Sequence, residues 1–90
     1  MDIIEYINTL PHYHKHVKQG HIVEVLEYKR QGVDCIDDGH FNGQMYIMSS
    51  NKYDTISISV QEHLAYLERG ELIDATDDEV AKYLLLKSGH

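Results

Sequence analysis

The chain has few of the residues that build covalent frameworks or rigid linkers. Its 90 residues include one cysteine and one proline, so no internal disulfide can form and no proline-rich linker is present. No apolar run approaches the roughly 18 residues that a membrane span requires, and we expect no membrane partner. The lone Cys35 fits a reducing compartment, and we expect the protein to be cytoplasmic.

Basic residues are also few, and they are scattered. Eight lysines and arginines stand against 15 acidic residues, for a net charge of −7, and only Lys29 and Arg30 are adjacent. Nucleic-acid binding needs clustered cations that displace the counterions of phosphate, so we expect no direct nucleic-acid binding. The excess negative charge lies in residues 33–90, with eleven acids and four bases, whereas residues 1–32 are neutral.

The N-terminal part of the chain is expected to be helical. Apolar residues recur at helical spacing over residues 3–10, and Asp2 can cap the first turn. Pro11 lacks an amide proton and interrupts this helix. A second helical segment is expected over 11–19, ended by Gly20 in the left-handed conformation.

The middle of the chain predicts a small antiparallel meander of three to four strands. The segment 21–29 fits a helix or a strand, and its β-branched content favours a strand. Further strands are predicted at 33–36, 44–50 and 53–59. Turn residues separate them at 31–32, 37–40, 42–43 and 51–52.

Two capping boxes predict helices in the C-terminal third. Ser59 with Glu62 opens the first helix, and Thr76 with Glu79 opens the second; a glycine ends each of them. Residues 1–90 are therefore interpreted as a single α+β domain. It has an N-terminal helical segment, the antiparallel meander, and two C-terminal helices packed on one sheet face.

An acidic run opens the last helix. It places four acids in six residues with no base between them: Asp74, Asp77, Asp78 and Glu79. Acids in a first turn favour the positive end of the helix dipole by about 0.3–1 kcal/mol each, which explains the run without any partner. The alternative is a docking patch for a protein with a basic surface, joined by three acids of the predicted hairpin: Asp34, Asp37 and Asp38. A sharper alternative is a DNA mimic that occupies a nucleic-acid-binding groove.

Four of the seven histidines lie between His12 and His21. His12 and His16 would share one face of a helix, whereas His12, His14 and His16 would all share one face of a strand. Metal binding by these three is an alternative, although no further residue at ligand spacing completes a tetrahedral shell. The simpler interpretation is that they are exposed and titrate normally, so that acidification below about pH 6 reduces the net negative charge.

The motifs of common enzyme families are missing. There is no Gly-x-Ser-x-Gly and no glycine-rich phosphate loop, and a chain this short offers few deep pockets. Cys35 stands among aspartates instead of beside a cation that would activate a thiolate, so we expect it to pack as an apolar residue. We expect no catalytic residues, no enzyme activity and no cofactor.

The last helix carries the strongest indication of a partner. At about 100° per residue, Val80, Tyr83 and Leu84 share one face and Leu86 lies opposite, so one small domain can hardly bury both sides. Leu86 is then either a single exposed leucine, which is ordinary on a protein surface, or part of a face for a partner or a second copy. We predict a small acidic protein–protein interaction module that inhibits or regulates a larger protein. The target could be nucleic-acid-handling machinery, which phage-encoded antagonists also bind. The acids supply the charged contact and Tyr83 and Leu86 an apolar one, while residues 77–88 offer a surface for a homodimer.

Overall fold

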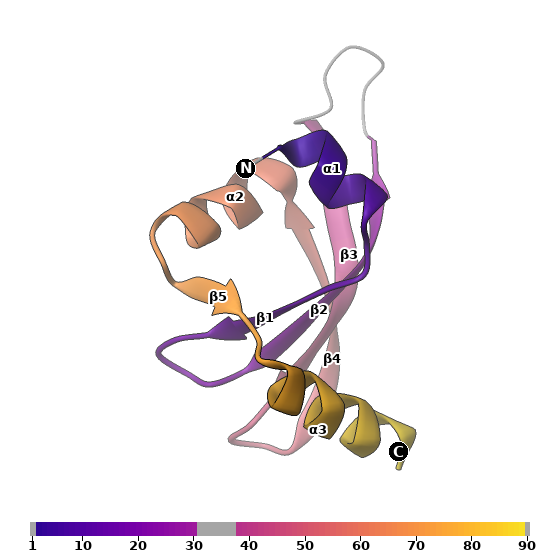
Figure 1. Ribbon diagram of the computed structural model, residues 1–90, viewed down its shortest axis with the longest axis vertical. Coiled ribbons are helices and arrows are strands. Elements are labelled where there is room, and N and C mark those ends of the chain that lie inside the picture. The colour runs from indigo at the N-terminus through magenta and orange to yellow at the C-terminus, as the bar shows by residue number, and fades with distance from the viewer. Residues whose placement is uncertain (1, 31–37, 90) are drawn as a thin grey trace.

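The computed structural model describes residues 2–30 and 38–89, which form one antiparallel sheet and three helices (Figure 1). The elements in chain order are α1 (Ile3–Asn8), β1 (His12–His16), β2 (Ile22–Lys29), β3 (His40–Ile47), β4 (Lys52–Ser59), α2 (Val60–Glu68), β5 (Leu72–Asp74) and α3 (Asp77–Ser88). The strands are ordered β4-β3-β2-β1-β5. The predicted α+β class is confirmed, with five strands in the sheet. None of the helices in the described residues is long and apolar enough to cross a membrane.

The segment 11–19, which was expected to be helical, contains the strand β1. β1 pairs with β2 on one side and with β5 on the other, so both of its edges are hydrogen-bonded. Its side chains alternate: His14 faces α2, and Tyr13 faces α3. Gly20 does adopt a positive φ of 72°, but in the turn that joins β1 to β2 instead of at a helix end.

The turn predicted at 42–43 lies inside β3. In the register of the sheet, Gly43 is opposite Val25, next to a bulge in β2. A Cβ atom on Gly43 would lie 1.8 Å from the carbonyl oxygen of Glu24, so this glycine permits the close approach of two strands and marks no turn.

The other strand predictions have mixed outcomes. Strands are present where the patterns of 21–29 and 53–59 predict them, and Asn51 turns the chain with a φ of 57°. The predicted strand 33–36 and the turn residues 31–32 lie outside the described residues.

The helices cover both faces of the sheet. α1 and α2 pack over a core that contains Val23 and Val25 of β2, whereas α3 packs over Ile22 and Tyr46 on the opposite face. The two C-terminal helices were expected on one face. They are separated because β5, which the sequence pattern did not predict, lies between them at the sheet edge and carries the chain across (Figure 1).

The predicted helix starts are formed. At α3 the Thr76 amide donates to Glu79 Oε1 at 3.0 Å and the Glu79 amide donates to Thr76 Oγ1 at 3.2 Å, which completes the capping box. At α2 the Ser59 side chain accepts the Glu62 amide hydrogen bond, and Gly70 follows the helix with a φ of 72°.

Candidate functional site

Three of the predicted acids are exposed at the junction of β5 and α3. The side chain of Asp74 is 91% exposed, and Asp77 and Asp78 are exposed in the first turn of α3. Within the described residues neither Asp77 nor Asp78 forms an ion pair, and Asp74 faces only His14 Nδ1, at 3.3 Å. These carboxylates are not neutralised by a lysine or arginine of the described fold.

The fourth acid of the run is already used by the fold. Glu79 Oε2 lies 2.7 Å from Lys15 Nζ on β1, while Glu79 Oε1 caps the amide of Thr76. The hydrogen bond from Lys15 and the one from Thr76 lower the pKa of Glu79. Glu79 therefore ties α3 to the sheet, and it is not a free contact for a partner.

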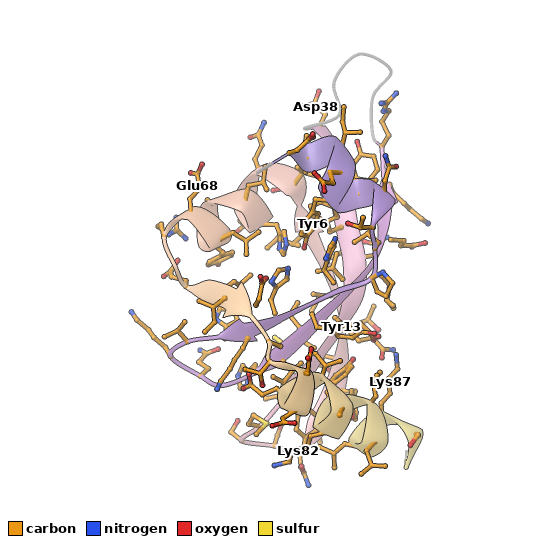
Figure 2. All side chains as sticks on the ribbon, in the orientation of Figure 1. Tyr6, Tyr13, Asp38, Glu68, Lys82 and Lys87 are labelled. Atoms are coloured by element: carbon orange, nitrogen blue, oxygen red, sulfur yellow. The ribbon has the colours of Figure 1, made fainter. Side chains whose placement is uncertain are left out.

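The predicted hairpin acids do not extend this patch. Asp34 and Asp37 lie outside the described residues. Asp38 is exposed, but Figure 2 places it at the opposite end of the molecule from Lys82 of α3, along an axis that extends 40 Å.

The two predicted apolar contacts of α3 belong to the core. Tyr83 is only 1% exposed, and Leu86 is half-buried in the same cluster with Ile22 and Tyr46. The burial of Tyr83 leaves no surface of that side chain for a partner, whereas the contact predicted for the half-buried Leu86 stays a prediction. The exposed leucines of α3 are Leu84, at 42%, and Leu85, at 74%.

A buried carboxylate sets the rotation of α3. Glu24 of β2 is buried, and its Oε1 accepts a hydrogen bond from the Tyr83 hydroxyl at 2.8 Å and one from Lys87 Nζ at 2.7 Å. Burial, together with the nearby Glu24, raises the pKa of Tyr83. The Tyr53 hydroxyl also donates to the Tyr83 carbonyl at 3.2 Å. These bonds turn the Tyr83 side of the helix toward the sheet.

The opposite side of α3 is then exposed to solvent. At about 100° per residue, six exposed residues fall within an arc of about 120°. They are Asp77, Asp78, Ala81, Leu84, Leu85 and Ser88, which together are called the outward face of α3. This face is acidic at its N-terminal end and apolar toward its C-terminal end. Sequence reasoning missed Leu84 and Leu85, although three consecutive leucines on a surface helix guarantee that one is exposed.

A second polar constellation lies on the other face of the sheet. The Tyr6 hydroxyl of α1 is 2.7 Å from His14 Nε2 and 2.8 Å from His63 Nε2, and all three side chains are buried. His14 Nδ1 has no well-aligned hydrogen bond but faces the acceptor Asp74 Oδ1. A proton on Nδ1 leaves Nε2 to accept from Tyr6, whose oxygen then accepts from His63.

This network is neutral at physiological pH. Burial lowers the pKa of His14 and lowers that of His63 to about 4, and burial also raises the pKa of Tyr6. The Tyr6 hydroxyl is enclosed by two imidazoles, so it cannot reach a substrate. The arrangement can join α1, β1 and α2 through hydrogen bonds, and it offers no exposed nucleophile.

The histidines of β1 share one face, as the strand alternative predicts, but they are not simply exposed. His12 Nε2 lies 2.8 Å from the Tyr6 carbonyl oxygen and 3.0 Å from Thr9 Oγ1, and the His16 ring packs against Tyr66. No group of three or more histidine, cysteine, aspartate or glutamate side chains among the described residues is placed to hold a metal ion. The alternative of a metal site at His12, His14 and His16 therefore has no support in this geometry.

The chain matches no protein-family model, no curated protein and no solved structure. Its function is therefore argued from the geometry of its own residues.

Proposed function

We propose that the protein is a binding module that docks a larger protein on the outward face of α3 and acts as its inhibitor or regulator. One observation carries the proposal. Leu84 and Leu85 are exposed on the same side of the helix as Asp77 and Asp78, which have no cationic partner in the described fold.

The chemistry of this face suits protein recognition. Transfer of an exposed leucine into a partner's apolar pocket contributes about 1.5–3 kcal/mol, which is the scale of an interface hot spot. Exposed carboxylates contribute little affinity, but they steer a basic partner and fix its orientation. The leucines therefore supply affinity and the aspartates supply direction.

The helix is also held ready for docking. Glu24, through its bonds to Tyr83 and Lys87, fixes the rotation of α3, and the Lys15–Glu79 ion pair holds its first turn. A helix ordered before association loses less conformational entropy on binding. The complementary partner is a groove with an apolar floor and lysine or arginine at the end that receives Asp77.

Affinity capture with matched variants tests the proposal. The double variant Leu84→Ser with Leu85→Ser should reduce capture of a specific protein about tenfold or more. The double variant Asp77→Asn with Asp78→Asn should slow association, mainly at low salt. Ile4→Ser is the apolar control, because Ile4 is 57% exposed on α1.

The outcomes separate the alternatives. Equal capture by wild type and the leucine variant would contradict docking on the outward face. Sedimentation that shows a dimer lost in the leucine variant would make a second copy the partner. Displacement of the captured protein by duplex DNA would favour mimicry of nucleic acid.

A further inference from the structure

A small pocket lies beside α3, on the face of the sheet that α3 covers. It has a volume of about 220 Å³ and is formed where β2 begins, where β3 ends, and along one side of α3. Three buried side chains line it: Ile22, Tyr46 and Tyr83. The half-buried Leu86 and the half-exposed Met48 complete an apolar lining.

The charges of the residues that line this pocket do not cancel. Lys15, Glu79 and Lys82 line it. Lys15 and Glu79 neutralise each other in the 2.7 Å ion pair. Within the part of the chain that the structure describes, Lys82 forms no ion pair, and its side chain is exposed. One cation is therefore left at the rim of an apolar hollow.

We propose that this pocket binds a small monocarboxylate with an apolar body, such as a medium-chain fatty acid. The carboxylate meets the Lys82 ammonium at the rim, and the hydrocarbon displaces water from the lining. The inference does not rest on the proposed function, because the pocket and the outward face use different sides of α3.

The volume limits the size of the ligand. Pockets for drug-sized ligands measure roughly 300–1,000 Å³, and 220 Å³ holds about seven water molecules at about 30 Å³ each. A carboxylate of about ten non-hydrogen atoms matches this size. Octanoate is therefore the probe, with octan-1-ol and octylammonium as neutral and cationic probes of the same length.

Titration followed by NMR of the methyl groups tests the site. Octanoate should shift the methyl signals of Ile22, Met48 and Leu86, and it should bind more tightly than octan-1-ol and octylammonium. Lys82→Ala should weaken octanoate two- to fivefold without changing octan-1-ol, the modest factor expected for an exposed ion pair. Lys82→Glu should reverse the preference toward octylammonium.

Lys29→Ala is the matched control. Lys29 ends β2 seven residues from Ile22, about 23 Å along the strand, so its removal should leave octanoate binding unchanged. Three results would overturn the proposal: no methyl shift at millimolar octanoate, equal binding of octanoate and octan-1-ol, or shifts confined to Leu84 and Leu85.

Discussion

The Tyr6 hydroxyl lies 2.8 Å from His63 Nε2, so α1 and α2 are joined by a buried hydrogen bond between residues 57 positions apart. The same oxygen lies 2.7 Å from His14 Nε2 of β1. One hydroxyl group thus pairs with the Nε2 atom of two buried imidazoles. A buried polar group without a partner costs about 1–3 kcal/mol, so the network stabilises the fold only while all three members are present.

Removal of this hydroxyl should destabilise the protein. Tyr6→Phe leaves two buried ring nitrogens without their partner, and we expect the free energy of unfolding in urea to fall by about 2–3 kcal/mol. The control is Tyr66→Phe, because the Tyr66 hydroxyl forms no hydrogen bond within the described residues; it should change stability by less than about 0.5 kcal/mol. Equal effects of the two variants would contradict the role of the network.

Acid should destabilise the fold through His63. Burial lowers its pKa to about 4, compared with about 6.5 in the unfolded chain. The unfolded state therefore binds the proton first, and the free energy of unfolding should fall by roughly 3 kcal/mol between pH 6.5 and pH 4. Burial also lowers the pKa of His14, which acts in the same direction.

The contribution of His63 is measured by urea unfolding at several pH values. His63→Gln keeps an amide donor and acceptor but cannot titrate, so its stability should depend less on pH in this window than that of the wild type. Parallel pH profiles for the two proteins would assign the acid sensitivity to other groups.

Glu24 should be needed to hold α3 on the sheet. Glu24→Ala leaves the buried Tyr83 hydroxyl without its acceptor and frees Lys87, so we expect a loss of about 2–4 kcal/mol in the free energy of unfolding. Amide hydrogen exchange in α3 should also become faster. Glu27→Ala, at an exposed position of the same strand, should change stability by about 0.5 kcal/mol or less. Unchanged exchange in α3 would contradict this role.

Gly43 should tolerate no side chain. An added Cβ would meet the Glu24 carbonyl oxygen at 1.8 Å, and neither backbone can move without breaking the sheet. Gly43→Ala should therefore cost about 3 kcal/mol or more, measured by thermal or urea unfolding. Gly89→Ala is the control, since its added Cβ would be 3.6 Å from the Leu86 carbonyl oxygen, an ordinary contact. A stable Gly43→Ala protein would show that the strands can separate there.

Features that depend on neighbouring residues could be predicted from the sequence. The capping box at Thr76 and Glu79 is recognised from four consecutive residues, and the alternation over 53–59 is recognised from seven. Both elements are present, and with α1 they are enough to predict the α+β class. The helix start depends on hydrogen bonds between neighbouring residues, and the strand depends on an apolar face that its own residues form.

Features that depend on distant partners could not be predicted. The segment 12–16 becomes a strand because β2 and β5 pair with both of its edges, and the three residues of β5 are too few to show a period. Gly43 resembles a turn residue beside Asn42 until the crowding against β2 is known.

The candidate site also has features that the sequence predicts and features that depend on distant residues. Exposure of Asp74, Asp77 and Asp78 follows from their charge and their place before a helix, so the sequence was sufficient to predict it. The burial of Tyr83 could not be predicted, because the rotation of α3 is set by Glu24, which lies 59 positions before Tyr83.

The pairing of β5 with β1 has a consequence for synthesis of the chain. Residues 72–74 form the edge partner of residues 14–16, so a growing chain lacks that partner until residues 72–74 have been made. Until then the backbone of β1 has unpaired amides and carbonyls along one side, a surface that other strands can join. A polypeptide that stops before residue 72 should therefore aggregate, because the edge of β1 stays open in it.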